Sequence, residues 1–281
     1  MAKVLLTKQI EFSASHRYHN DAWDAARNRS VFGACNHLHG HGHNYLLQVT
    51  VGGEVDEETG MVVNLFDLKQ VLIQALEEFD HKHLNLDTPY FKHRVPTTEN
   101  VAGVLWKILS AHPQIGTLER IRLFEDEDLY ADITPDSGSD QQSVQRACLT
   151  RRYDFSAAHR VWCHQLPEAD NNRLFGKCSH PGTHGHNYLL YVTVQGEIHP
   201  ETGMITDIPA LDRVVHERVI QRFAYANLNE DPEFSAGGTT GENLARFIWN
   251  LLIRSIPAGR LARIGLAVTP DASYEYRGTT L

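Results

Sequence analysis

Two stretches of the chain share a histidine spacing that is typical of a metal site. His41 and His43 form an H-x-H motif, and His16 lies 25 residues before the first of them. The second half repeats this spacing at His159, His184 and His186. Residues two apart in a strand point to the same face, so three imidazoles could surround one ion. Three neutral nitrogens with an open position are the ligand set of a catalytic zinc rather than a structural one.

The loop before the first H-x-H motif, within CNHLHGHGHNY (35–45), contains two further histidines. His39 aligns with Gly182 or Thr183 in the second half, and His37 aligns ambiguously with His180. We therefore interpret His37 and His39 as loop residues and not as metal ligands.

A cysteine lies six residues before the first histidine of each H-x-H motif, at Cys35 and at Cys178. A nearby cation lowers the pKa of a thiol, which would make it a base or a nucleophile. A fourth zinc ligand and a buried filler are the alternatives. Its recurrence in both halves favours a functional loop cysteine.

Three polar residues of the first half have no counterpart in the second. Asp80 and His81 in FDHKHLN become Ala224 and Tyr225 in FAYANLN, and Glu125 becomes Val268. A carboxylate next to an imidazole can orient a tautomer and move a proton. A histidine at a helix C-terminus and a charge on an edge strand are the ordinary structural explanations. The pattern predicts that the second half kept a metal site and lost part of the chemistry.

These residues belong to a tandem repeat. A shift of 143 positions aligns FSASHR with FSAAHR, HGHNYLL with itself, and VTVGGEVDEETGMV with VTVQGEIHPETGMI. The repeated unit is a whole domain, longer than the 20–50 residues of a solenoid repeat. We predict a first domain at 1–134, a polar linker at 135–149, and a second domain with a degenerate site at 150–281.

Alternating apolar residues predict strands at 3–15 and 44–55, which would position the histidines. Asn64 is a candidate N-cap for a helix over 65–79, and a second helix is expected from about Thr97 to Ala111. Closing strands are expected at 118–126 and 128–134. The second copy repeats this order, with strands near 151–158, 187–197, 261–269 and 273–277, and helices near 208–223 and 241–254. We predict an α+β fold of two ββααββ domains, each an antiparallel sheet with helices on one face.

Composition narrows the class of protein. The net charge of −9 over 281 residues argues against nucleic acid as the main partner. No apolar run is long enough to span a membrane, and no export signal is recognised, so we expect a cytoplasmic protein with no membrane partner. The four cysteines are then expected to be thiols rather than disulfides.

The motifs FSASHR, FGxCN, HGHNY, GExDxxTGMVxNLxDLK, FDHKHLN, PYF and TTENVA resemble the 6-pyruvoyl-tetrahydropterin synthase family, and the likeness covers both copies. The resemblance implies a tunnelling fold, in which such units assemble into a barrel, and hence a homo-oligomer. It also implies a lyase that converts 7,8-dihydroneopterin triphosphate to 6-pyruvoyl-tetrahydropterin and releases triphosphate.

Carried over by position, the resemblance implies that His16, His41 and His43 bind Zn²⁺, as would His159, His184 and His186. Cys35 would abstract a proton, with Asp80 and His81 completing its relay. Glu125 would anchor the pterin, and Thr97 and Thr98 would line its pocket. Cys178 would be a residual thiol of the second copy, in which catalysis and pterin anchoring are in doubt.

Two alternatives follow from the same residues. A 6-carboxytetrahydropterin synthase of the queuosine pathway would use the same substrate, and its shorter gap between cysteine and HGH fits Cys35 and His39. A non-catalytic pterin- or zinc-binding protein would not need Asp80 and His81.

Overall fold

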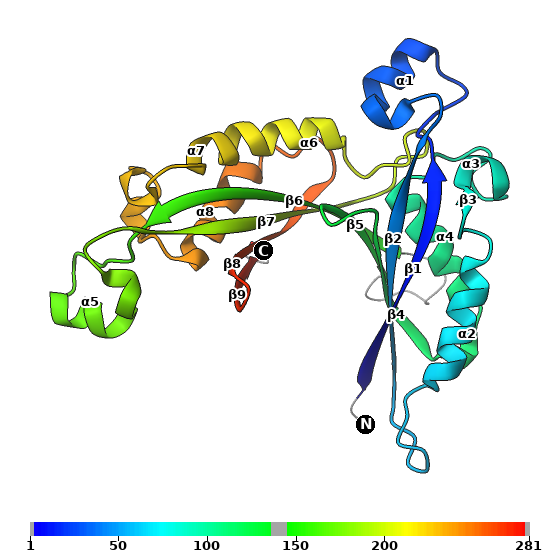
Figure 1. Cartoon of the computed structure of the whole chain (residues 1–281), viewed down its shortest axis with the longest axis horizontal. Helices are drawn as coiled ribbons and strands as arrows, with labels where there is room; N and C mark the ends of the chain where they lie inside the picture. The colour runs from blue at the N-terminus through cyan, green and yellow to red at the C-terminus, as the bar shows by residue number, and fades with distance from the viewer. Residues whose placement is uncertain (1–2, 136–144, 279–281) are drawn as a thin grey trace. The chain divides into compact units, whose positions relative to one another are not determined.

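The computed structural model describes residues 3–135 and 145–278 (Figure 1). By its contacts the chain forms two compact units, Met1–Thr150 with Gln195–Asp207, and Arg151–Val194 with Ile208–Leu281. The first unit thus includes a short segment from the second sequence repeat. Residues 136–144 of the predicted linker lie outside the described part of the chain, and residues 145–149 belong to a strand. The division into domains at 1–134 and 150–281 therefore stays a prediction.

The first unit is built on a sheet in the order β3-β1-β2-β4-β5. Its strands are β1 (Val4–His16), β2 (His41–Gly53), β3 (Lys82–His83), β4 (Thr117–Phe124) and β5 (Leu129–Pro135). The sheet is mixed, because the two-residue strand β3 pairs in parallel with β1 whereas the other pairs are antiparallel. The expectation of a purely antiparallel sheet was therefore wrong at this strand, which is too short to show a periodic pattern.

Helices α2 (Leu65–Leu76) and α4 (Thr98–Ser110) pack on this sheet, α2 against β1 and α4 against β4 and β5. The Asn64 side chain accepts a hydrogen bond from the N–H of Phe66 and caps α2, as predicted. Thr97 caps α4 in the same manner by accepting from the N–H of Asn100. Apolar residues at helical spacing, such as Leu68 and Leu72, are fully buried between helix and sheet. A short helix α3 (Leu84–Asp87) follows β3.

A helix not predicted from the sequence lies between β1 and β2. It is α1 (Ala25–Phe32), and it ends at Gly33, whose φ of +54° favours glycine. Cys35 follows in the next turn, so the helix determines where the thiol is placed. The second unit has the equivalent helix α5 (Glu168–Phe175), which ends at Gly176 with a φ of +51°.

The second unit repeats this plan with strands in the order β6-β7-β8-β9. The strands are β6 (Gln145–His159), β7 (His184–Gly196), β8 (Arg260–Thr269) and β9 (Ala272–Tyr276). Helix α8 (Gly241–Leu252) packs on β8 and β9. The helix predicted near 208–223 is α6 (Ile208–Val215), a π-turn at 216–220, and α7 (Gln221–Phe223). No described helix is long and apolar enough to cross a membrane.

Candidate active site

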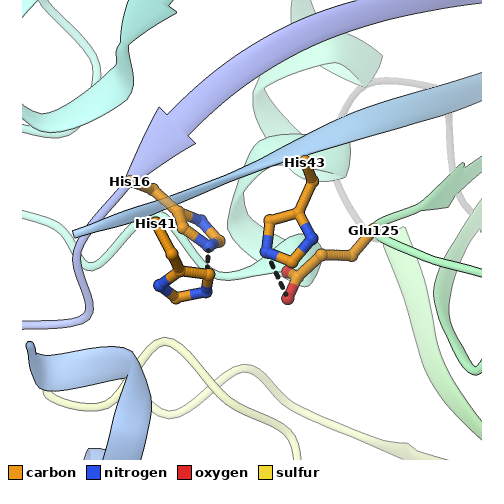
Figure 2. Close-up of side chains that lie close together, drawn as sticks. All are labelled: His16, His41, His43 and Glu125. Carbon is orange, nitrogen blue, oxygen red and sulfur yellow. Dashed lines mark hydrogen bonds and ion pairs between the residues drawn. The ribbon is translucent and has the colours of Figure 1, made fainter.

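The pairing of β1 with β2 brings three histidines of the first copy together. His16 lies directly opposite His41, and Ala14 lies opposite His43, so all three rings share one face of the sheet. The ring centroids are 4.6 Å apart for His16 and His41, 5.1 Å for His16 and His43, and 4.9 Å for His41 and His43. Figure 2 shows the rings converging on one point next to Glu125.

The nitrogen atoms of this cluster fit a divalent cation. One ligand atom from each of His16, His41, His43 and Glu125 lies within 4.8 Å of the others. The Nε2 atoms of His16 and His41 are 3.1 Å apart, and the buried Nε2 of His43 has no hydrogen-bond partner among the described residues. Burial lowers the pKa of His16 to about 4, so its imidazole is neutral at pH 7, the form that binds metal.

The ring of His16 is held in place from its other side. Its Nδ1 lies 3.1 Å from the Pro96 carbonyl oxygen and 3.0 Å from the Tyr45 hydroxyl. Such contacts select the tautomer that leaves Nε2 available to a metal ion. Tyr45 is itself fully buried and stacked on Phe12.

Glu125 follows β4 directly and is 5% exposed. Its carboxylate accepts hydrogen bonds from the Tyr18 hydroxyl at 3.0 Å and from the Thr98 hydroxyl, and one oxygen lies 3.5 Å from Nε2 of His43. A buried carboxylate oriented by two hydroxyls can accept hydrogen bonds from a ligand with paired N–H groups. It could also serve as a fourth metal ligand, which the sequence did not suggest.

A second buried carboxylate, Glu99, was not predicted as a site residue. It is 1% exposed and accepts a hydrogen bond at 3.0 Å from the N–H of Ile205, in the 195–207 segment of the same unit. Burial raises the pKa of Glu99 to about 7. The sequence does offer one signal for this residue, because Glu99 recurs in the second copy as Glu242.

Other contacts hold the 195–207 segment against the first copy. The Thr97 hydroxyl donates to the Gly203 carbonyl oxygen, and Met204 is buried in a cluster with Tyr18, Phe32 and Val95. Cys35 packs against the same cluster. The surroundings of the Cys35 thiol therefore include a residue of the second sequence repeat.

Asp80 and His81 lie in different surroundings from Cys35. The Asp80 carboxylate accepts hydrogen bonds from the N–H of Ser13 and from Nδ1 of His81, both at 2.9 Å. The Ser13 N–H is the main cause that lowers the pKa of Asp80. The His81 side chain is 82% exposed and lines a hollow beside His43 and His83. The predicted pair thus exists as a hydrogen-bonded unit next to a metal-ligand candidate.

Comparison with known proteins agrees with this geometry. The profile described as 6-pyruvoyl tetrahydropterin synthase matches residues 5–136 and again residues 148–279. The chain belongs to this family. The two matches also show that the family domain is present twice, as a tandem duplication.

Individual relatives include proteins named as 6-pyruvoyl and as 6-carboxy synthases. The human 6-pyruvoyl tetrahydrobiopterin synthase is 45% identical over 121 residues, which are 43% of this chain and 83% of the human protein. A putative 6-carboxy-5,6,7,8-tetrahydropterin synthase of Archaeoglobus fulgidus is 36% identical over 94 residues, covering 33% of this chain and 74% of that protein. The solved 6-pyruvoyl tetrahydropterin synthase of Caenorhabditis elegans is 37% identical, with a TM-score of 0.43 over 45% of this chain and 91% of that one. The family match and the 45% identity to the human protein indicate a lyase of the 6-pyruvoyl tetrahydropterin synthase type.

The second family domain also gathers its three histidines. Ring centroids are 4.5 Å apart for His159 and His184, 5.2 Å for His159 and His186, and 5.1 Å for His184 and His186. The Nε2 atoms of His159 and His184 are buried without a hydrogen-bond partner among the described residues. The residues present therefore fit a cation here too, but no carboxylate corresponds to Glu125.

His37 and His39 are exposed, and their rings lie 5.8 Å apart in the loop before β2. The metal candidates are instead His41 and His43, so the thiol at position 35 lies six residues before the first of them. No disulfide links the four cysteines, all of which are in the described part of the chain.

Proposed function

We propose that the first copy converts 7,8-dihydroneopterin triphosphate to 6-pyruvoyl-tetrahydropterin with release of triphosphate, and that its metal is Zn²⁺. The observation that supports this most strongly is the Glu125 carboxylate, held by Tyr18 and Thr98 next to three clustered imidazoles. The proposal includes a homo-oligomer in the cytoplasm, as expected from the resemblance and the sequence.

In this proposal Glu125 binds the guanidine-like edge of the pterin, accepting its paired N–H groups. Thr98 orients that carboxylate, and Thr97 holds the start of α4 beneath the pterin pocket. His16, His41 and His43 would hold the zinc ion. When bound, zinc would act as a Lewis acid on the substrate's side-chain hydroxyls and acidify the neighbouring C–H.

Cys35 is the proposed general base. Its Sγ, as the thiolate, accepts the carbon-bound proton. The Asp80 carboxylate holds the Nδ1 proton of His81, which leaves Nε2 of that imidazole to accept or donate a proton in the relay. The His81 side chain is exposed at one hollow, whereas Cys35 packs against a different cluster of residues. We therefore propose that the Asp80–His81 pair and the Cys35 thiol come together between neighbouring chains of the oligomer.

The experiment is to incubate the purified chain with 7,8-dihydroneopterin triphosphate and identify the product by mass. We expect triphosphate and a pyruvoyl product. A carboxy product with loss of a two-carbon fragment would instead assign the chain to 6-carboxytetrahydropterin synthesis. Absence of turnover in the zinc-loaded protein would contradict catalysis.

Matched cysteine variants test which copy acts. Cys35→Ala is expected to lower kcat by roughly 10²-fold or more, the usual contribution of a general base. Cys178→Ala should change kcat by less than about two-fold, because the second copy lacks the Asp80–His81 pair. Equal losses from both variants would show that both thiols are needed.

A further inference from the structure

The first unit contains two adjoining hollows outside the metal cluster. The larger has a volume of about 560 Å³, within the size range of small-molecule sites. The smaller has a volume of about 410 Å³, and the two share His93, Arg94 and Pro200 in their walls. Every residue that lines them belongs to the first unit, including those of the 195–207 segment. We call the two hollows together the basic trough.

Cationic side chains are concentrated in the basic trough, although the whole chain has a net charge of −9. Arg17, Lys92 and Arg94 line the larger hollow, and Lys107 lines the smaller one. Lys92, Arg94 and Lys107 are exposed, and none of the described residues forms an ion pair with them. Cations that share a hollow without counter-charges create a positive potential there, which attracts an anion.

The acidic residues of the trough do not balance these charges. The Asp21 side chain is 86% exposed and lies 3.5 Å from Nε2 of His19. Glu201 forms an ion pair at 3.2 Å with Arg27, which lies outside the trough. Among the described residues, no other acidic residue lines either hollow. The trough therefore keeps an excess of positive charge.

The loop that carries most of these cations differs between the two copies in charge but not in its anchor. Phe91 and its counterpart Phe234 are both 2% exposed, so the same buried ring precedes each loop. The next three residues are KHR (92–94) in the first copy and SAG (235–237) in the second. Since the second copy has the anchor without the cations, we infer that the cations are not there to build the loop.

The turn that closes the trough also differs in charge from its counterpart. The first copy has Asp56 and Glu57 in this turn, and the second copy has His199 and Pro200 at the same positions. His199 and Pro200 are the residues that lie in the wall of the trough. The turn that faces the cations thus lacks two carboxylates that the other turn carries, which keeps the potential of the trough positive.

We propose that the basic trough binds a chain of phosphates. Ammonium and guanidinium groups are the side chains that proteins use to bind phosphate, and arginine does so with two parallel hydrogen bonds. Cations spread from Arg17 to Lys107 over two hollows fit several linked phosphates better than a single one. The imidazoles of His19, His83 and His93 are further donors, and Nδ1 of His83 is buried without a hydrogen-bond partner among the described residues.

The phosphate chain comes from one of two sources. It is the triphosphate of the substrate, an assignment that rests on the proposed function, or it is a free oligophosphate that binds independently of the pterin. Arg17 directly follows the metal-ligand candidate His16, and Tyr18, between Arg17 and His19, donates to Glu125. The trough therefore starts at residues that flank the proposed metal and pterin site, which favours the triphosphate of the substrate.

Calorimetric titration of the zinc-loaded full chain with inorganic triphosphate tests the proposal. Lys92→Ser/Arg94→Ala removes two exposed cations of the trough. Lys69→Ser/Arg213→Ala is the matched control, because it removes two exposed cations of helices α2 and α6. We expect the trough variant to bind triphosphate at least about ten-fold more weakly than the unmodified chain, and the control to bind within about two-fold of it.

These comparisons also separate the trough from other sources of binding. Chelation of zinc by triphosphate would contribute equally in all three proteins, so the differences between them report on the trough. Orthophosphate should bind the unmodified chain at least about ten-fold more weakly than triphosphate, because a single phosphate reaches fewer cations. Lys107→Ala, in the adjoining hollow, should weaken triphosphate binding about three-fold.

Several results would overturn the proposal. One is a failure of the unmodified chain to bind triphosphate, and another is equal binding by the unmodified chain and the trough variant. Equal losses in the trough variant and the control would show that only the net charge matters. Equal affinities for orthophosphate and triphosphate would exclude a site for a chain of phosphates.

Two further ligands distinguish the sources. If the trough holds the triphosphate of the substrate, the trough variant should bind 7,8-dihydroneopterin triphosphate about ten-fold more weakly and 7,8-dihydroneopterin as tightly as before. If it holds a free oligophosphate, the variant should bind both pterins as tightly as the unmodified chain does. Either result supports the phosphate site. Because binding is measured without turnover, an inactive chain that still shows the loss in the trough variant would contradict only the proposed function.

Discussion

Glu125 combines a negative charge with almost complete burial and two oriented hydroxyl donors. Glu125→Gln keeps the shape of the side chain but replaces one acceptor oxygen with a donor N–H₂. We expect KM for the proposed pterin substrate to rise roughly 10- to 100-fold, since a hydrogen bond to a charged group contributes about 1.5–3 kcal/mol. Steady-state kinetics measure this effect. Glu58→Gln, in an exposed turn, is the control and should leave KM unchanged.

Glu99 should give the first unit a pH-dependent stability. Its pKa is raised from 4.5 to about 7 in the folded protein, so the folded state retains a proton that the unfolded chain loses. Stability from this residue is therefore complete below pH 4.5 and decreases as the pH rises to about 7. Glu99→Gln, which resembles the protonated form, removes this decrease.

The measurement is the unfolding midpoint of both proteins between pH 4 and 8. The Glu99→Gln protein should match the unmodified chain near pH 4.5 and exceed its stability at pH 8 by up to roughly 3 kcal/mol, at about 1.4 kcal/mol per pH unit. Parallel curves over the whole range would mean that Glu99 does not titrate in this window.

At the scale of elements, two equivalent turns differ in what they contact. Gly60 has a φ of +69° and no atom within 4 Å of a built Cβ, whereas Gly203, with a φ of +74°, would place its Cβ 2.6 Å from Nδ2 of Asn100. Both alanine substitutions place a Cβ on a residue with a left-handed backbone, which lowers the free energy of unfolding by roughly 1–2 kcal/mol. Gly203→Ala adds overpacking, about 1–3 kcal/mol more.

We therefore expect Gly203→Ala to lower both the unfolding midpoint and first-copy turnover, although residue 203 belongs to the second sequence repeat. Gly60→Ala is the matched control and should have the smaller effect on both. Thermal unfolding and kinetics on the two variants would detect the difference. Identical losses would show that the contact with Asn100 is unimportant.

The main strands and helices were predictable because each has a strong local pattern. Alternation along β1 and β2 and the Asn64 cap identified these elements, and the repeated spacing identified the histidines. Helices α1 and α5 were missed because both are short and polar, with little apolar periodicity. The contact of Glu99 with Ile205 was not predictable, since it joins residues 106 positions apart through a backbone N–H, which leaves no pattern in side-chain types.

At the scale of the whole molecule, the separate positions of the proposed catalytic groups make the proposed assembly testable. Chains carrying Cys35→Ala and chains carrying His81→Ala should each be inactive. If the thiol and the Asp80–His81 pair of one site come from different chains, coexpression restores about a quarter of the wild-type activity, because random assembly pairs intact groups at one site in four.

The control is coexpression of Cys35→Ala chains with chains that carry both substitutions, which should remain inactive. Activity is measured on the copurified oligomer. Lack of recovery in the mixed oligomer would place both groups of a site in the same chain.

The turn after α2 also indicates how the two copies came to differ. His81 and its counterpart Tyr225 have φ values of 57° and 59°, and each donates its N–H at 2.6 Å to a serine carbonyl, Ser13 or Ser156. A bulky aromatic residue is disfavoured in such a backbone, and Tyr225 is 93% exposed with little packing to stabilise it. The backbone shape suits a histidine paired with an aspartate, and the second copy has neither. The ancestor that was duplicated is therefore best described as a domain that had the aspartate and the histidine. The second copy lost these two side chains but inherited the backbone that had presented them, as the shared φ values record.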